Sequence, residues 1–336
     1  MGESVDGRKL RWGVLGTANI GRAAVNPAIQ ASRNGALLAV ASRDEERAGA
    51  FARAAGIPRS YGSYESLLDD PDIDAVYVPL PNSLHREWVL RAAAAGKHIL
   101  CEKPLGLTEE ECREMADAAA GVGVTLMEAF MYRFHPRMAR VVEMAQTGAV
   151  GAVGAIRSVF TFRLRSQDNI RLSPELGGGA LMDVGCYCVN VSRTVAGAEP
   201  VAVQARANWA PSGVDAELAG TLHFADGLLA HFDCALTLER REVCEVAGSE
   251  GVLSVPSAFL PGTDDVVIEE LRGRAPEVRH LVPGVDEYRL MVEHFADAVL
   301  LGTSVRYDAY EAALNMRVIE GLYRSARQGG GVVDLS

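Results

Sequence analysis

Short apolar runs alternate with segments of helical periodicity over the first 128 residues of the chain. Runs of this kind, separated by helices, are typical of parallel strands that helices cover on both faces of a sheet. We expect strands in the run that ends at Gly16 and over 36–41, 75–78, 98–102 and 124–128. We expect helices from near Ile20 and over 44–55, 65–68, 82–95 and 108–120, with caps at Ser63 and Thr108.

The pattern changes after Glu128. Apolar residues then recur at every second position, for example at all even positions from Leu228 to Leu238. Such alternation is typical of an antiparallel sheet with two unlike faces. Strands are expected over 156–164, 201–207, 218–224 and 228–238, and helices over 136–146, 179–196, 286–301 and 308–327.

The two patterns together predict an α/β protein with two domains. Residues 1–128 are expected to form a doubly wound parallel sheet, and residues 129–336 an α+β domain with an open, mainly antiparallel sheet. The C-terminal helices either stay with the second domain or pack back on the first. A length of 336 residues is consistent with two domains.

Composition excludes several classes of protein. A net charge of −11 argues against a nucleic-acid-binding surface, and no apolar run reaches the ~18 residues that a membrane span needs. The first ten residues are polar and lack the core of a signal peptide, so we expect a cytoplasmic protein. The six cysteines have no metal-ligand spacing, which predicts reduced packing thiols and no metal site; they lie at 101, 112, 186, 188, 234 and 244.

The turn after the first apolar run carries a phosphate-binding pattern. Gly16-x-Ala18-x-x-Gly21 is the dinucleotide fingerprint with alanine in the middle position. The first glycine permits a tight turn, and the small middle residue lets the backbone approach a pyrophosphate. The following helix offers unpaired N–H groups to the phosphate charge. Because the turn opens a series of strand–helix units, we predict a Rossmann domain whose cofactor contacts include Gly16, Thr17, Ala18, Asn19 and Ile20.

The end of the second predicted strand indicates which dinucleotide binds. NAD-binding domains place an acid there to accept from the ribose 2′-hydroxyl, whereas this chain has Ser42 and Arg43. A hydroxyl and a guanidinium suit a 2′-phosphate, which a carboxylate would repel. Asp44 and Glu45 fit better as acids in the first turn of the next helix. The sequence therefore favours NADP, with NAD as the alternative.

Polar residues follow three further strand ends. Glu102-Lys103-Pro104 ends a central strand, where an ammonium can stabilise a developing alkoxide, although most lysines are simply exposed. Pro81 and Asn82 precede His85 at another strand end, where Asn82 fits a helix cap and His85 fits a structural histidine as well as a cofactor contact. Glu128 ends the last strand and is predicted near the reactive end of the cofactor.

A second group of candidates lies in the other domain. Gly177-Gly178-Gly179 precedes a predicted helix, so its backbone is expected to approach a ligand with free amides. Asp183 and Tyr187 are four residues apart on that helix, where a carboxylate can orient a phenol or a substrate hydroxyl. The alternative is a solvated acid and a core tyrosine. Polar residues that could line a substrate cleft are Arg133, His135, Asp168 and Arg171.

Taken together, these motifs resemble the glucose-fructose oxidoreductase / inositol dehydrogenase / MocA family over nearly the whole chain. The resemblance implies hydride transfer between NAD(P) and a sugar, polyol or related alcohol. It further implies that Lys103 is the active-site lysine, Asp183 the substrate-orienting acid, and Glu128 a residue near the nicotinamide. Tyr187 takes the place of a histidine in inositol-dehydrogenase-like members, so the chain resembles the xylose and dihydrodiol dehydrogenases and the deoxysugar ketoreductases.

We therefore expect an NADP-preferring oxidoreductase acting on a sugar or related cyclic alcohol, with Tyr187 passing the proton and Lys103 stabilising the oxyanion. Two alternatives stay open: a cofactor-bound sensor or repressor without turnover, and a sugar–sugar transhydrogenase that retains its cofactor. The substrate itself is not predicted. An open sheet face often finds a partner, so we expect a homodimer or homotetramer with no nucleic-acid or membrane partner.

Overall fold

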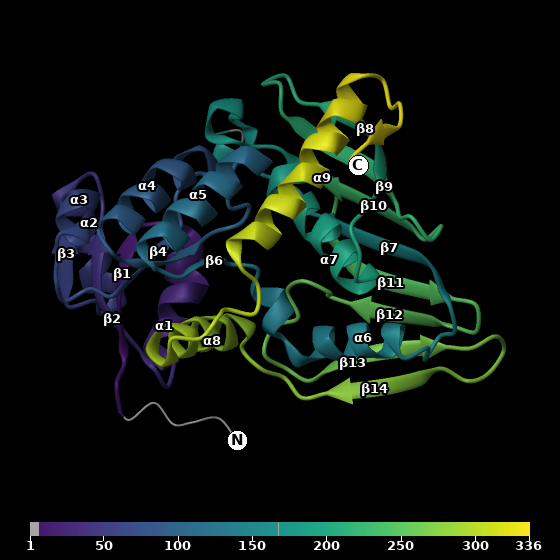
Figure 1. Ribbon diagram of the computed structural model, residues 1–336, viewed down its shortest axis with the longest axis horizontal. Helices are drawn as coiled ribbons and strands as arrows, with labels where there is room; N and C mark the ends of the chain where they lie inside the picture. The colour runs from purple at the N-terminus through teal and green to yellow at the C-terminus, as the bar shows by residue number, and fades with distance from the viewer. Residues whose placement is uncertain (1–6, 167) are drawn as a thin grey trace. The chain divides into compact units, whose positions relative to one another are not determined.

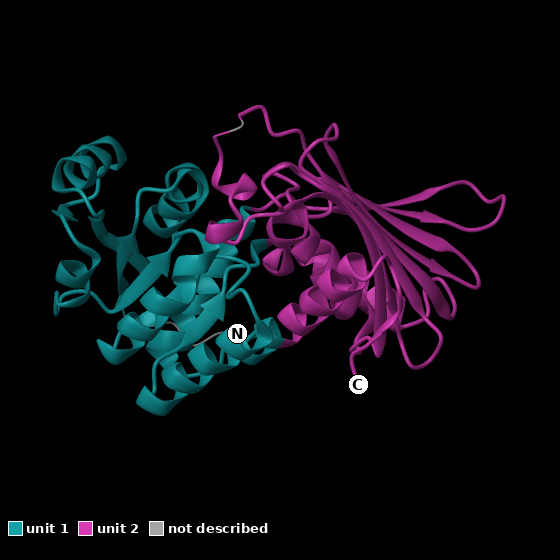
Figure 2. Cartoon of the chain, turned by 90° about the horizontal axis from the view of Figure 1, so that it is seen from above, with its two compact units in different colours: residues 1–131, 286–313 teal, residues 132–285, 314–336 magenta. Residues whose placement is uncertain are grey.

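The computed structural model describes residues 7–166 and 168–336, which form two compact units. The first comprises the described residues up to Met131 together with Asp286–Ala313. The second comprises the described residues of Tyr132–Val285 together with Leu314–Ser336 (Figure 2). Residues 1–6 of the polar N-terminal segment lie outside the described part of the chain.

The first unit contains a six-stranded sheet in the order β3-β2-β1-β4-β5-β6 (Figure 1). Every strand pair is parallel, and the order is that of a doubly wound dinucleotide-binding sheet, as predicted. The strands are β1 (Leu10–Leu15), β2 (Gly35–Ala41), β3 (Arg59–Tyr61), β4 (Ala75–Val78), β5 (His98–Cys101) and β6 (Leu126–Glu128). Sequence reasoning missed β3, because its three residues lack a buried side chain.

Helices pack around this sheet. They are the π-helical η1 (Gly21–Val25), α1 (Asn26–Ala31), α2 (Glu45–Ala55), α3 (Tyr64–Leu68), α4 (Asn82–Ala94), α5 (Glu109–Val122) and α8 (Glu287–Leu301). The predicted caps are confirmed at Ser63 and Thr108, whose hydroxyls accept from the backbone of Ser66 and Glu111. The predicted cap at Asn82 is wrong, since Asn82 is already helical and Pro81 holds the cap position without a side-chain bond.

The late helix α8 belongs to the first unit, although it follows the second unit's strands in the chain. It contacts α1, β1 and β2. Phe295 of α8 packs on Trp12 of β1, with ring centroids 5.1 Å apart. Two ion pairs from Arg33 to Glu293 and Asp297 hold the same surface.

The second unit contains a nine-stranded sheet in the order β14-β13-β12-β11-β7-β10-β9-β8-β15. All its pairs are antiparallel except β7 with β10, so the mainly antiparallel sheet is confirmed. The strands are β7 (Val153–Thr161), β8 (Ala202–Trp209), β9 (Asp215–His223), β10 (Leu229–Ala235), β11 (Arg241–Gly248), β12 (Val252–Pro256), β13 (Val266–Leu271), β14 (Val278–Val282) and β15 (Val333–Asp334).

Helices cover one face of this sheet (Figure 1). They are α6 (Pro136–Gln146), α7 (Cys186–Ala196) and the second-unit part of α9 (Ala309–Arg327). Short turns are η2 (Met131–Phe134), η3 (Ile170–Leu172), η4 (Pro174–Leu176) and the π-helical η5 (Leu181–Gly185). In the described part of this unit the opposite face of the sheet carries no helix (Figure 2). Exposed polar side chains on the strands of the sheet include Gln204, Arg206 and His231.

Two findings bear on the composition arguments. All six cysteines are buried and free, as expected for packing thiols. Among the described residues, no helix combines the length and apolar character needed to cross a membrane.

Candidate active site

The phosphate-binding turn has the backbone that its sequence predicts. Gly16 adopts a φ of +119°, which L-residues with a side chain rarely tolerate. A Cβ atom there would lie 3.1 Å from the side chain of Leu80, in the loop after β4. The Gly16 N–H donates to the carbonyl of Ala41, the last residue of β2. The turn is thus fixed beside the carboxyl ends of β2 and β4, where the strand order reverses and ligands bind in such sheets.

Two guanidiniums flank this turn. Arg43 is exposed just beyond β2, and Arg47 on α2 donates from Nε to the Thr17 hydroxyl at 2.8 Å. Burial raises the pKa of the Tyr64 hydroxyl, and the charges of both arginines partly offset that rise, so both lie near Tyr64. Sequence reasoning missed Arg47; its signal was a second arginine four residues after Arg43, on the helix that follows.

The acids that follow β2 interact with the start of α2. Asp44 accepts from the backbone N–H of Arg47 at 2.7 Å and is the N-cap of α2. Glu45 and Glu46 occupy the first turn of the same helix, where negative charge complements the helix dipole. The expectation that these residues serve the next helix is confirmed.

The loop that carries Lys103 is held by buried groups on three neighbouring segments. The hydroxyl of Tyr77 on β4 donates to the Glu102 carboxylate at 2.5 Å. The carboxylate of Glu128, at the end of β6, accepts from the Leu105 N–H at 2.7 Å. Burial raises the pKa of Tyr77 well above its usual value, and the nearby Glu102 charge raises it further, so the phenol stays protonated and donates. The Lys103–Pro104 peptide is cis.

His85 on α4 bridges two of these loops. Its ring is wholly buried, with Nδ1 2.9 Å from the Pro104 carbonyl and Nε2 2.9 Å from the Leu80 carbonyl. A neutral imidazole has one N–H and donates to only one of two carbonyls, whereas a protonated ring donates to both. Burial lowers the pKa of this ring, while the carbonyl bonds raise it. Through its contacts with the Leu80 and Pro104 carbonyls, His85 links the loop after β4 to the loop of Lys103.

The first-unit candidates therefore come together at one edge of the sheet. Each lies at or just beyond the carboxyl end of a parallel strand: Gly16 to Ile20 after β1, Ser42 and Arg43 after β2, Pro81 and Asn82 after β4, Glu102 and Lys103 after β5, and Glu128 at the end of β6. Ser42 and Glu128 are buried, and Lys103 is partly exposed.

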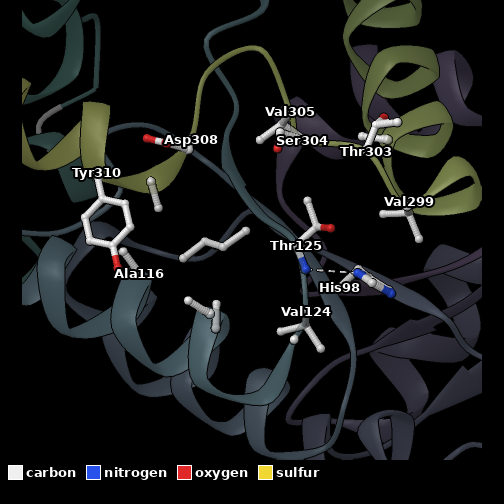
Figure 3. A pocket seen from close by; sticks show the side chains of 17 residues that line it. His98, Ala116, Val124, Thr125, Val299, Thr303, Ser304, Val305, Asp308 and Tyr310 are labelled. Carbon is white, nitrogen blue, oxygen red and sulfur yellow. Dashed lines mark hydrogen bonds between the residues drawn. The ribbon is translucent and has the colours of Figure 1, made fainter.

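A separate pocket lies at the opposite ends of β5 and β6. It has a volume of about 430 Å³ and is lined by His98, Thr125 and Tyr310, among others (Figure 3). His98 begins β5, and its Nδ1 accepts from the backbone of Thr125 at 3.0 Å. Because the strands run from this pocket towards Lys103 and Glu128, it is distinct from the predicted cofactor edge.

In the second unit, an ion pair joins two of the candidate site residues. Arg171 of η3 donates from Nε to the Asp183 carboxylate at 2.5 Å, and its guanidinium lies 5.8 Å from the Phe162 ring. The structure thus brings together two residues that the sequence suggested separately. Asp168 is exposed in the loop before η3, while Arg133 and His135 are buried near the start of α6.

Tyr187 lies within a cluster of aromatic rings. The rings of Tyr132, Phe160 and Phe259 have centroids 5.4 to 5.8 Å from that of Tyr187, and only 5% of Tyr187 is exposed. These rings come from β7, from the loop after β12 and from the start of the unit. The cluster fixes the ring plane of Tyr187, and nothing in the linear sequence linked its members.

The expectation that the triple glycine offers free amides to a ligand is wrong. The Gly178 N–H donates to the Ser173 carbonyl and the Gly179 N–H to the Arg171 carbonyl, each at 2.9 Å. At the helix start, the Leu181 N–H donates to a buried carboxylate. The helix also opens with the π-turn η5, which contains Asp183, so Asp183 and Tyr187 are not separated by four residues of regular α-helix.

Comparison with known proteins identifies the family. Residues 10–130 match the model of the GFO/IDH/MocA oxidoreductase family with an NAD-binding Rossmann fold, and residues 138–254 match that of the GFO/IDH/MocA C-terminal domain. The chain belongs to the GFO/IDH/MocA oxidoreductase family. The resemblance drawn from the sequence motifs is thereby confirmed.

Several members of the GFO/IDH/MocA family are similar along nearly their whole length. The D-xylose 1-dehydrogenase (NADP(+)) 2 of Haloferax volcanii is 42% identical over 96% of this chain and 99% of its own. The 3-ketoreductase KijD10 from Actinomadura kijaniata, solved with NADP and TDP-benzene, superposes with a TM-score of 0.91 at 30% identity, covering 95% and 98% of the two chains. The aldose-aldose oxidoreductase from Caulobacter crescentus, solved with glycerol, has a TM-score of 0.89 at 30% identity, covering 97% and 100%.

Proposed function

We propose that this chain is an NADP-preferring oxidoreductase that transfers hydride between nicotinamide and a hydroxyl or carbonyl carbon of a sugar or related cyclic alcohol. Its membership of the family and the relatives described above support this function. The observation that carries it furthest is the loop of Lys103, held rigidly by Tyr77, His85 and Glu128 at the cofactor edge of a doubly wound sheet. A protein that only sensed a dinucleotide would not need a lysine on a loop held in this way.

The residues at the end of β2 fit NADP better than NAD. Arg43 and Arg47 supply positive charge beside the phosphate-binding turn, and the acids that follow β2, Asp44, Glu45 and Glu46, lie at the start of α2. A guanidinium forms charge-assisted bonds to a phosphate, whereas NAD-binding domains place a carboxylate at the end of this strand to accept from the ribose 2′-hydroxyl, where this chain has Ser42. Gly16, Thr17, Ala18, Asn19 and Ile20 would hold the pyrophosphate, and Pro81, Asn82 and Glu128 would contact the nicotinamide half.

In this proposal the chain's own side chains manage the proton while bound NADP supplies the hydride chemistry. Tyr187 accepts the proton of the substrate hydroxyl during oxidation and returns it during reduction. Lys103 lowers the pKa of that phenol and stabilises the oxyanion. Asp183 orients the substrate hydroxyl, and Arg171 holds Asp183 in place through their ion pair. Arg133 and Asp168 complete the substrate-contacting set.

A second candidate is transfer between two sugars with a cofactor that stays bound. The similarity to an aldose-aldose oxidoreductase favours it. The two candidates differ in one measurable respect: a dehydrogenase consumes added NADPH or NADP stoichiometrically, whereas a transhydrogenase turns over without free cofactor. We further propose that the protein is a cytoplasmic homodimer or homotetramer, with residues 1–128 serving the dinucleotide and residues 129–336 serving substrate and assembly.

Initial rates test the proposed function. The change in NADPH absorbance should be followed with aldoses, nucleotide-linked ketosugars and dihydrodiols, in both directions and with both cofactors. We expect turnover with at least one of these classes and a higher kcat/KM for NADP(H) than for NAD(H). Tight NADP binding without turnover on any member of the panel, with or without a second sugar, would instead support a sensor.

A further inference from the structure

The helix that carries Asp183 and Tyr187 has no local cap. Ala180 occupies its N-cap position and offers no side-chain hydrogen bond. The missing acceptor comes from a distant strand instead: the Leu181 N–H donates at 2.6 Å to Oδ2 of Asp215, at the start of β9 and 34 residues further along the chain. A carboxylate there satisfies an otherwise unpaired amide and complements the helix dipole.

Asp215 is itself fixed from a third element. Only 1% of it is exposed, and its Oδ1 accepts from the hydroxyl of Tyr323 on α9 at 2.7 Å. Asp215 approaches the backbone of residue 179 so closely that only glycine fits at that position. A Cβ atom on Gly179, whose φ is +125°, would lie 2.1 Å from Asp215 Oδ1 and 2.9 Å from the Tyr323 oxygen. The third glycine of the motif therefore makes room for this carboxylate rather than for a ligand.

The same turn also sets the position of Arg171. The Gly179 N–H donates to the Arg171 carbonyl at 2.9 Å, and a Cβ on Gly178 would lie 2.4 Å from that oxygen. Arg171 in turn pairs with Asp183. One glycine turn thus links the buried carboxylate to the helix start on one side and to the partner of Asp183 on the other.

We propose that Asp215 and Tyr323 are positioning residues for the reaction: by anchoring the glycine turn, they set where Asp183 and Tyr187 stand. This inference rests on the proposed function, because it assigns catalytic work to those two side chains. Neither Asp215 nor Tyr323 needs to touch substrate. Their effect follows from geometry, since misplacing a catalytic group by about 1 Å can cost on the order of 100-fold in rate.

Two Asp215 variants separate anchoring from charge. Asp215→Ala removes the bonds from Leu181 and Tyr323 together. In Asp215→Asn the amide oxygen still accepts from Leu181 and the amide nitrogen donates to the Tyr323 oxygen, so the anchor survives without its charge. Ser325→Ala is the matched control. Ser325 lies on α9, is as buried as Asp215, and its hydroxyl accepts a hydrogen bond from the backbone N–H of Ala205. It lies in the same unit but does not hold the glycine turn.

The experiment measures kcat, KM, NADPH affinity and hydrogen exchange of the 181–187 backbone amides in all variants. For Asp215→Ala we expect faster exchange over 181–187 and a kcat lowered about tenfold or more, with NADPH affinity unchanged. Asp215→Asn should keep most of the rate, and Ser325→Ala should lose thermal stability but keep both its rate and the exchange protection of 181–187. Tyr323→Phe, which retains the Leu181 bond, should give an intermediate fall in kcat and serves if Asp215→Ala does not fold.

Unchanged exchange over 181–187 in Asp215→Ala would overturn the anchor. Faster exchange with an unchanged kcat would overturn the positioning role. Failure of the proposed function is seen separately, as NADP binding by the wild type without turnover, and failure of the proton role of Tyr187 is seen as full activity of Tyr187→Phe. In either case the exchange data still decide whether Asp215 holds the turn.

Discussion

At the scale of single residues, we propose that cofactor choice depends on Arg43. We expect Arg43→Ala to weaken NADP much more than NAD, because a lost charge-assisted bond to the 2′-phosphate is worth about 1.5–3 kcal/mol, or about one to two orders of magnitude in affinity. Fluorescence titration of the two cofactors measures this difference. Arg47→Ala, which removes the neighbouring guanidinium and its bond to Thr17, is the companion variant. Equal losses for NADP and NAD would show that Arg43 does not read the phosphate.

Asp215 also predicts a pH dependence of stability. Burial raises its pKa from 3.8 to about 6, although bonds from Tyr323 and the helix start oppose the rise. The folded state therefore retains a proton that the unfolded state loses, so this group makes the free energy of unfolding fall as pH rises from about 4 to about 6. Two pKa units correspond to about 3 kcal/mol. Urea denaturation of wild type and Asp215→Asn between pH 4 and 8 should show that difference, and parallel curves would contradict it.

At the scale of elements, the bridge made by His85 connects α4 to the loop of Lys103. His85→Ala removes the ring that bridges the Pro104 and Leu80 carbonyls and should lower kcat about tenfold, because the loop of Lys103 loosens. His98→Ala is the control, since it also removes a histidine that bonds a backbone group, but at the opposite ends of the strands. Thermal melts and kcat are measured for both variants. Equal losses of stability with an unaltered kcat would show that His85 stabilises the fold but does not position the loop of Lys103.

Local patterns predicted most elements, and long-range contacts were the part that could not be predicted. The apolar runs of β1, β2 and β4 and the caps at Ser63 and Thr108 are local signals. The strands from β11 to β15 were missed. At the edge strand β14, charged and exposed residues interrupt the alternation, and β15 has only two residues. The anchor at Asp215 could not be predicted at all, because Asp215 and its two partners lie on three elements that only the folded chain brings together.

The candidate site shows the same division. Residues at strand ends, such as Lys103 and Glu128, could be grouped in advance because parallel strands place their carboxyl ends at one edge. The aromatic rings around Tyr187 could not, since Phe160 and Phe259 are nearly 100 residues apart and share no motif. Arg47 was within reach of a sequence argument, but its contact with Thr17 depends on the tilt of α2.

At the scale of the whole molecule, the uncovered face of the nine-stranded sheet predicts assembly. Sedimentation velocity at micromolar concentration should show a dimer or tetramer. His231 is exposed on β10, near the middle of that face, so His231→Glu should shift the equilibrium towards monomer. Arg53→Glu, on the exposed side of α2, should leave assembly unchanged. A wild-type monomer at these concentrations would remove the prediction.

The central claim is that Lys103 and Tyr187 act as one unit, and kcat of three variants tests it most directly. Tyr187→Phe keeps the ring in its aromatic cluster and deletes the hydroxyl, so the fold should survive. General acid–base catalysis contributes about 10²–10⁴-fold, so kcat should fall by about that factor, and Lys103→Met should do similar damage while NADPH still binds. The double variant should be little worse than the worse single variant, because groups that act together are not additive. A Tyr187→Phe enzyme that keeps more than about a tenth of the wild-type kcat would contradict the account, since the proton would then travel by another group.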